Sequence, residues 1–278
     1  HITTGTALEH AKMGIPTDIT LYTAGTPNGI KITILLEELG LEYKIRTLQF
    51  STNEQKAPWF LEINPNGRIP AITDTWTDGS EIRVFESGAV MQYIVDRYDK
   101  DHKVSYPSGS KETWEVNSWA SLFSLACGVT RCDLHWQMAG LGPMQGQANH
   151  FQRYAPEKIE YGINRYVNET RRLYSVMDSH LAKSTSGFLA GDRLSIADIA
   201  CWAWVAAHAW AEVSLDEFPH VNKWLHALLL RPGFEKGRHI PEPHTAFGFA
   251  NMTAEEKDKM AEATKTWVQS NMQADAKK

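Results

Sequence analysis

The spacing of apolar residues divides the chain into two parts. In the first part, short apolar runs of strand length are interleaved with runs of helical spacing. They predict strands at 19–22, 43–48, 71–73 and 82–85, and helices at 30–39, 57–63 and 86–98. From Glu112 to about Pro232, apolar residues recur only at helical spacing. The pattern predicts a small α/β domain followed by an all-α domain.

Changes in composition mark the borders of these parts. The segment 99–111 is polar and contains Pro107 and Gly109, which is typical of a linker between domains. We therefore expect an N-terminal extension, an α/β domain, a linker, an all-helical domain and a C-terminal tail, at residues 1–18, 19–98, 99–111, 112–240 and 241–278.

The C-terminal tail contains a predicted helix of its own. Thr253 and Glu256 have the spacing of a capping box, in which a hydroxyl and a carboxylate satisfy backbone N–H groups at a helix start. The charged sequence after them predicts a helix to about Asn271. We expect this helix to lie in solvent on the surface rather than to pack across the cleft between the domains.

A second capping box lies inside the helical domain. Ser195 and Asp198 precede the apolar run from Ile199 to Val205. We assign Asp198 a structural role, and we expect its replacement by alanine to cost about 1 kcal/mol or more.

Composition narrows the functional classes. A net charge of −5 argues against nucleic acid as the main partner. No apolar run reaches membrane-spanning length, and the first residues lack the basic and then apolar order of a signal peptide, so we expect a cytoplasmic protein without a membrane partner. The three cysteines are too few for a disulfide framework. The eleven histidines show no ligand spacing, so we expect no metal site.

The most informative sequence lies between residues 64 and 88. The dipeptide Ile69-Pro70 stands where a turn enters the strand at 71–73, and X-Pro bonds are where cis peptides occur. Such a turn leaves the backbone N–H and C=O of Ile69 free to pair with an extended peptide ligand. Glu86 and Ser87 open the next helix and could hold an ammonium and a carboxylate. Together these features predict a site for a small zwitterionic peptide.

This pair of motifs resembles the glutathione transferase superfamily, whose first domain has the thioredoxin fold and whose second domain is helical. The resemblance implies that glutathione is the co-substrate. It implies that Ile69, before a cis Pro70, pairs with the cysteinyl backbone of glutathione. It also implies that Glu86 and Ser87 hold the γ-glutamyl end.

The turn after the first strand, residues 23–29, contains no cysteine, so the ligand must bring any reactive sulfur. The thiolate is the nucleophile, and hydroxyl and amide donors at a helix N-terminus stabilise it. Thr26 and Asn28 are the donors that the turn offers, and we assign them the catalytic role. Tyr22 is the rival, since several transferase classes use a tyrosine near this point, but its place inside the strand favours a core role.

The stretch Thr26-Pro-Asn-Gly-x-Lys31 resembles the nu-class transferases, which act as disulfide-bond oxidoreductases. It is also similar to the related fungal branch that includes a yeast nitrogen-catabolite regulator. The segment 137–147 extends this resemblance. By the resemblance, Gln55 and Arg68 also bind glutathione, and Arg165 reaches it from the other subunit of a homodimer.

The chain departs from the family between Trp119 and Gln137, where the segment 120–135 is an insert. Cys127 and Cys132 lie in this insert, and we expect both to be reduced and structural. Because the insert falls where the helical domain should border the active site, it affects the expected pocket for the second substrate.

Two reactions of a glutathione transferase remain open: conjugation of glutathione to a small electrophile, and glutathione-dependent reduction of a disulfide or peroxide. The Thr-Pro-Asn-Gly turn favours reduction. The resemblance of residues 56–65 to fungal transferases of secondary metabolism favours conjugation. The alternative is a non-catalytic regulatory protein that keeps the transferase fold to bind a protein partner.

Overall fold

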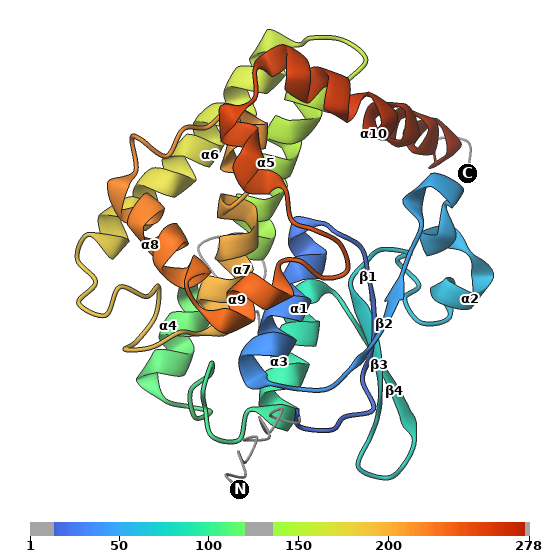
Figure 1. The fold of residues 1–278 in the computed structure, drawn as a ribbon, viewed down its shortest axis with the longest axis vertical. Coiled ribbons are helices and arrows are strands. Elements are labelled where there is room, and N and C mark those ends of the chain that lie inside the picture. Colours follow the sequence, from blue (N-terminus) through green and yellow to red (C-terminus); the bar gives the residue numbers. More distant parts are fainter. Residues whose placement is uncertain (1–13, 120–135, 276–278) are drawn as a thin grey trace, which may run out of the picture.

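The computed structural model describes residues 14–119 and 136–275 (Figure 1). The predicted insert at 120–135, with Cys127 and Cys132, lies outside the described residues, as does most of the N-terminal extension. Within the described residues, an α/β part built around one sheet packs against a larger helical part (Figure 1).

Four strands form one mixed sheet in the order β2-β1-β3-β4. They are β1 (Thr20–Thr23), β2 (Lys44–Thr47), β3 (Ala71–Thr75) and β4 (Glu81–Phe85). Strands β1 and β2 are parallel, while β3 is antiparallel to both β1 and β4. The register places Leu21 opposite Ile72 and Ile72 opposite Val84. This confirms the predicted α/β fold class, with its βαβ and ββα order.

The two faces of the sheet carry different helices: α1 (Pro27–Leu39) and α3 (Ser87–Tyr98) on one, α2 (Pro58–Leu61) on the other. Leu21 and Ile72 belong to the large core that α1 and α3 share with the helical part. The neighbouring positions Tyr22 and Ala71 point to the opposite face and pack with Phe60 of α2.

Helix α1 begins at Pro27, earlier than the expected Ile30, because the turn itself supplies the cap. Thr26 has extended backbone angles, and its hydroxyl accepts the N–H of Gly29. Pro27 needs no N–H in the first turn of a helix. Gly40 ends the helix in the left-handed region, as expected for a C-terminal glycine. The residues expected to form a turn therefore lie at a helix N-terminus.

All regular elements in the described residues of the second part are helices, as predicted. Its helices are α4 (Lys111–Trp119), α5 (Gly142–Asn149), α6 (Glu160–Leu181), α7 (Ile196–Val205), α8 (Pro219–Leu229), α9 (Pro232–Gly237) and α10 (Ala254–Asp275). Short π-helical turns flank α5 at Trp136–Leu141 and His150–Tyr154. Helix α7 lies at the centre: all of its residues except Trp204 are buried.

Helix α10 is not simply solvated, so the expected surface role is wrong. The predicted capping box of Thr253 and Glu256 is present, and the helix runs past Asn271 to Asp275. Lys257 is buried and pairs with Glu212 at 3.0 Å. These contacts attach the start of the helix to the helical part.

The other half of α10 extends towards the α/β part (Figure 1). There Trp267 stacks on Phe50 with ring centroids 5.4 Å apart, and its Nε1 donates to Asn53 Oδ1 at 3.1 Å. The sequence pattern missed this packing because both contact residues come from a segment more than 200 positions away along the chain, with a separation of 214 between Trp267 and Asn53. The helix thus bridges the two parts of the fold.

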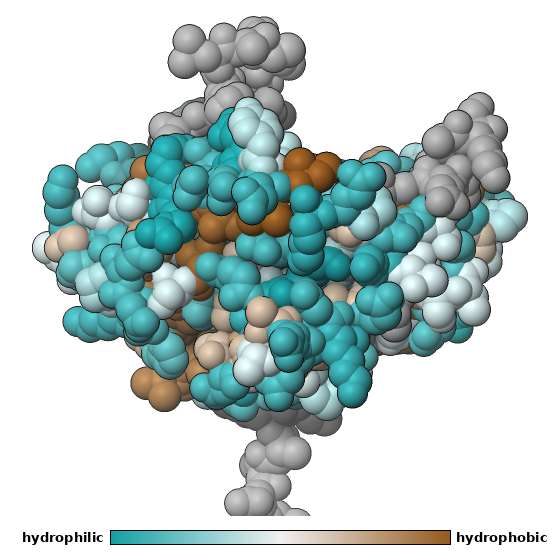
Figure 2. All heavy atoms as spheres, turned by 90° about the horizontal axis from the view of Figure 1, so that it is seen from above, coloured by the Kyte–Doolittle hydropathy of each residue, from teal (hydrophilic) through white to brown (hydrophobic). Residues whose placement is uncertain are grey.

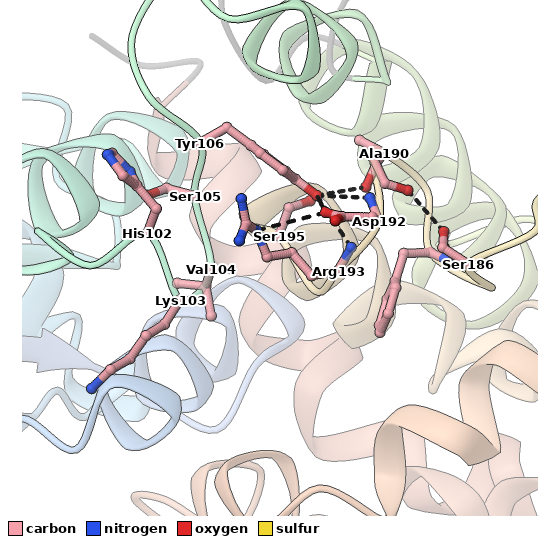
Figure 3. A network of polar contacts seen from close by, with 12 residues as sticks. His102, Lys103, Val104, Ser105, Tyr106, Ser186, Ala190, Asp192, Arg193 and Ser195 are labelled. Carbon is pink, nitrogen blue, oxygen red and sulfur yellow. Dashed lines mark hydrogen bonds and ion pairs between the residues drawn. The ribbon is translucent and has the colours of Figure 1, made fainter.

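The segment that links the two parts is also fixed by hydrogen bonds, around Tyr106 (Figure 3). The Tyr106 hydroxyl accepts the backbone N–H groups of Asp192 and Arg193, at 2.9 and 3.2 Å. The guanidinium of Arg193 lies 4.5 Å above the tyrosine ring. Next to them, the carbonyl of Val104 accepts the N–H of Ile196, the first residue of α7. The linker is therefore part of the packed structure.

Replacing Tyr106 by phenylalanine is expected to lower the free energy of unfolding by about 1–3 kcal/mol, because it leaves two backbone N–H groups without their acceptor. Denaturant unfolding checks this. Tyr161→Phe is the matched control, since Tyr161 is 81% exposed. Equal stability of the two variants would contradict the structural role of the Tyr106 hydroxyl.

Three further findings concern the described residues. The face shown in Figure 2 is mostly hydrophilic, with hydrophobic residues gathered in narrow places between polar ones. Among the described helices, none is long and apolar enough to cross a membrane. In the same part of the chain, no group of three or more His, Cys, Asp or Glu side chains could hold a metal ion.

Candidate functional site

The N-terminus of α1 carries the two residues predicted to act on a sulfur. Thr26 uses its hydroxyl oxygen to accept the N–H of Gly29 at 3.2 Å. A hydroxyl that accepts through its oxygen still has its own O–H to donate. No cysteine is present in the turn between β1 and α1. Thr26 is therefore available as a donor to a ligand atom in front of the helix.

Asn28 is held in one orientation by two donors. Its Oδ1 accepts from Lys31 Nζ at 2.8 Å and from Trp204 Nε1, on α7, at 3.1 Å. Since the indole N–H of Trp204 can only donate, the amide oxygen of Asn28 must face this pair. The Nδ2 group of the half-buried Asn28 then points away from this pair, with two hydrogens to donate.

Lys31 lies at the centre of a cluster that joins the two parts of the fold. Its side chain is fully buried. Besides Asn28, its Nζ contacts Gln137 Oε1 at 2.6 Å and Ser87 Oγ at 3.4 Å. Burial lowers the pKa of Lys31 to about 7, although the nearby Cys201 and Glu86 act in the opposite direction.

The loop before β3 has the geometry that a peptide site needs. The Ile69–Pro70 peptide bond is cis, as the resemblance implies. The amide of Asn64 fixes the loop by donating to Arg68 O at 2.6 Å, while Asn64 Oδ1 accepts from Asn66 N at 2.9 Å. Within the described residues, the backbone N–H and C=O of Ile69 make no hydrogen bond. They are free to pair with an extended ligand.

Glu86 and Ser87 stand at the start of α3. Glu86 has a φ of 68°, a left-handed value that is uncommon outside glycine and is often found at functional sites. Its exposed carboxylate accepts from the Asn66 amide at 3.1 Å, which ties it to the Ile69 loop. Ser87 is the first residue of α3 and is buried. The free N–H groups of the first helical turn surround it and favour an anion.

The predicted residues Gln55 and Arg68 lie on the α/β part, at or next to the 64–70 loop. Gln55 is buried on a 3₁₀ turn, and its Nε2 donates to Asn53 Oδ1 at 3.3 Å. Its Oε1 is buried without a hydrogen-bond partner. Buried polar atoms are normally paired, so this oxygen marks a position where a ligand N–H could bind. The side chain of Arg68 is exposed at the turn before Ile69.

Arg165 is not brought to this cluster within one chain. It lies exposed on α6, which packs against α5 and α8. Most of the remaining predicted residues fall into two groups, while the side chains of Thr26 and Gln55 bond to their own turns, at Gly29 and Asn53. Lys31 joins Asn28 and Ser87, and the 64–70 loop joins Arg68, Ile69 and Glu86.

The rival residue Tyr22 lies in a different environment. Its ring packs against Trp59 and Phe60, with centroids 6.2 and 6.0 Å apart, on the sheet face that α2 covers. It makes no hydrogen bond to the Asn28 cluster among the described residues. This packing agrees with the expected core role.

Sequence reasoning assigned no role to Lys31, Gln137 or Trp204, which hold Asn28 in place. One signal for Lys31 was available. It is the one charged residue in the apolar stretch 30–36, and a helix that is buried on all sides must bury its lysine too. Gln137 and Trp204 gave no such signal, because their contacts depend on how the two parts pack.

Family models describe both parts of this chain. The model of the glutathione S-transferase N-terminal domain matches residues 17–96, and that of the glutathione S-transferase C-terminal domain matches residues 138–232. The first of these ranges contains every predicted site residue except Arg165.

Individual relatives agree with these models. The disulfide-bond oxidoreductase YfcG of Escherichia coli is 40% identical over 216 residues, which is 77% of this chain and 91% of YfcG. A glutathione transferase homologue from Lodderomyces elongisporus, solved with two GSH per subunit, is 41% identical. It superimposes with a TM-score of 0.73 over 81% of this chain and 99% of that one. The transferase URE2P6 of Phanerochaete chrysosporium, solved with oxidized glutathione, is 40% identical with a TM-score of 0.70, over 80% of this chain and 94% of its own. The chain therefore belongs to the glutathione S-transferase family.

Proposed function

We propose that this protein is a glutathione-dependent enzyme that activates the thiol of glutathione at Thr26 and Asn28. The orientation of Asn28 carries the proposal. Its oxygen is held by Lys31 and Trp204, so its N–H donors are left for a thiolate. The relatives support glutathione as co-substrate, since two of the compared structures contain it in reduced or oxidised form.

The rest of the glutathione molecule would lie along residues 19–98. The free backbone of Ile69, next to Pro70, would pair with the cysteinyl residue as an added strand. Glu86 and Ser87 would hold the γ-glutamyl ammonium and carboxylate at the start of α3.

Three further residues would complete the binding site. The unpaired Gln55 Oε1 and the exposed Arg68 lie near the Ile69 loop and would contact the remaining groups of glutathione. Arg165 is remote from these residues within one chain, so it would act from the partner subunit of a homodimer. We place this enzyme in the cytoplasm, where the buried free thiol of Cys201 would stay reduced.

The favoured reaction is reduction of a disulfide by two glutathione molecules. In the first step the bound thiolate attacks the disulfide, which forms a mixed disulfide and releases one thiol. In the second step another glutathione attacks the mixed disulfide, which yields oxidised glutathione and the second thiol. Cys201 cannot replace glutathione as nucleophile, because burial raises its pKa and keeps it a thiol. YfcG, which is named a disulfide-bond oxidoreductase, supports this choice over conjugation.

Turnover of hydroxyethyl disulfide and of a chloronitrobenzene by the same preparation tests the proposal. We expect rapid disulfide reduction with weak conjugation. The reverse result would make the protein a conjugating transferase that acts on small electrophiles. If the protein bound glutathione but turned over neither substrate, the enzymatic proposal would fail and a regulatory protein of transferase fold would be favoured.

A further inference from the structure

The surroundings of the Lys31 ammonium lack a negative charge in contact with it. Its contacts are neutral: the amide oxygens of Asn28 and Gln137, the hydroxyl of Ser87 and, at 3.7 Å, the sulfur of Met138. Among the residues that the structure describes, no carboxylate forms an ion pair with it. Lys31 is nevertheless fully buried.

An unpaired buried ammonium is costly. Moving a charge out of water costs several kcal/mol unless an opposite charge or strong hydrogen bonds replace the lost hydration. The other charged and titratable groups that face Lys31 do not provide that charge by contact. Glu86 is exposed and bonded to Asn66, and Cys201 is a neutral thiol on α7. The positive end of α1 adds to the local positive potential.

The position of this charge matches the proposed chemistry. Lys31 directly contacts Asn28, the residue whose N–H donors are proposed to face the glutathione sulfur. A thiolate bound there would bring a negative charge to the cluster, in addition to the γ-glutamyl carboxylate proposed for Ser87, whose Oγ lies 3.4 Å from Lys31 Nζ. An opposite charge within about 4–6 Å typically lowers the pKa of an acid by about 1–3 units.

We propose that Lys31 is a positioning residue that also serves as the buried counter-charge of the bound glutathione thiolate. It positions Asn28 by donating to the amide oxygen, and it stabilises the anion through space. The thiol proton passes to solvent, and no covalent bond forms or breaks at Lys31. This inference rests on the proposed glutathione site and adds a charge requirement to it.

The protonation of the buried Lys31 is then coupled to the binding of the glutathione thiolate. In the free protein the Lys31 pKa is about 7, so the ammonium is close to losing its proton at neutral pH. A thiolate beside it favours the charged form, so the thiol and the ammonium titrate as a pair. Cys201 and Glu86 act on Lys31 in the same direction as the thiolate but without contact.

The experiment measures the pKa of the thiol in the complex with glutathione, from the ultraviolet absorbance of the thiolate as a function of pH. Lys31→Met removes the charge and keeps a side chain of similar length. We expect it to raise the pKa of the bound thiol by about one unit or more. Lys31→Arg keeps the charge and is expected to restore a titration close to that of the wild type. Lys44→Met is the control, since Lys44 is exposed on β2.

Binding of S-methylglutathione, which has no thiol proton, is measured for each variant. Lys31 also contacts Ser87 Oγ, which is proposed to hold the γ-glutamyl carboxylate, so the uncharged variants are expected to bind S-methylglutathione more weakly. Each thiol titration is therefore made with the variant saturated by glutathione. A titration of Lys31→Met that superimposes on that of the wild type overturns the inference. A folded Lys31→Arg variant that titrates like Lys31→Met overturns it too, since charge would then not be the cause.

Failure of the Lys31 inference can be told apart from misfolding and from failure of the proposed glutathione site. If Lys31→Met does not fold, Lys31→Gln takes its place, since it keeps polar contacts without the charge. A raised pKa of the bound thiol in Lys31→Gln then supports the inference, and an unchanged pKa overturns it. If the wild type does not bind S-methylglutathione at all, the proposed function fails and the inference with it. Binding with an unchanged thiol pKa in the uncharged variants removes the inference alone.

Discussion

Replacing Asp198 by alanine is expected to lower the free energy of unfolding by about 3–5 kcal/mol. The carboxylate is fully buried. Its Oδ1 accepts from Leu189 N and Trp224 Nε1, both at 2.9 Å, and its Oδ2 accepts from the N–H and hydroxyl of Ser195 at 3.1 Å. Alanine would leave these buried donors without an acceptor. The expected loss exceeds the value of about 1 kcal/mol that a capping box alone suggests.

Denaturant unfolding at several pH values checks this prediction. Burial raises the pKa of Asp198 to about 6, above its ordinary value of 3.8. An acid whose pKa is higher in the folded state stabilises the fold below its unfolded pKa and loses that contribution as pH rises through the folded pKa. The difference in free energy of unfolding between wild type and Asp198→Ala should therefore become smaller as pH rises from about 4 to 6. Asp101→Ala, at an exposed linker position, is the control. An unchanged melting temperature for Asp198→Ala would contradict the structural role.

Asn28→Ala is expected to lose about 100-fold or more of turnover, the usual cost of removing one donor to a developing anion. Binding of S-methylglutathione should change less than a few-fold, because the peptide backbone and termini are held by other residues. Steady-state kinetics and calorimetry on the same preparation check both parts.

Asn28→Asp is the matched variant for this prediction. Aspartate keeps an oxygen for Lys31 and Trp204 but removes the N–H donors and adds a negative charge. If Asn28 acts as a donor to the thiolate, Asn28→Asp should be at least as inactive as Asn28→Ala. Retained activity in Asn28→Asp would show that only the contact between the two parts of the fold matters. A fully active Asn28→Ala together with an inactive Tyr22→Phe would move the thiol activation to Tyr22.

Features with a local cause were predictable from sequence. The capping box of Ser195 and Asp198 is present as predicted. It could be predicted because its hydrogen bonds join residues only three positions apart. The thioredoxin-like order followed from short apolar runs between Ile19 and Phe85, and the special turn at Ile69-Pro70 followed from a single proline. The site residues predicted near these two motifs rest on the same reasoning, since their place depends on their own backbone segment.

Features that depend on packing across the chain were not predictable. Lys31 meets Gln137 across 106 positions, and Asn28 meets Trp204 across 176. Local spacing carries no information about such contacts, so the residues that orient Asn28 were missed. The same reason explains the wrong expectation for α10, whose charged sequence is typical of a solvated helix but whose ends are attached to both parts of the fold.

The cluster around Asn28 also limits how this protein can be recombined with its relatives. Lys31 and Asn28 come from the α/β part, whereas Gln137 and Trp204 come from the helical part. A chimera that takes its first domain from one relative and its second from another would keep the 64–70 loop complete, yet it could lose the partners that orient the Asn28 amide. A domain of this protein can therefore be replaced only together with its contact residues in the other domain. An exchange within this family has to preserve Lys31, Gln137 and Trp204 together.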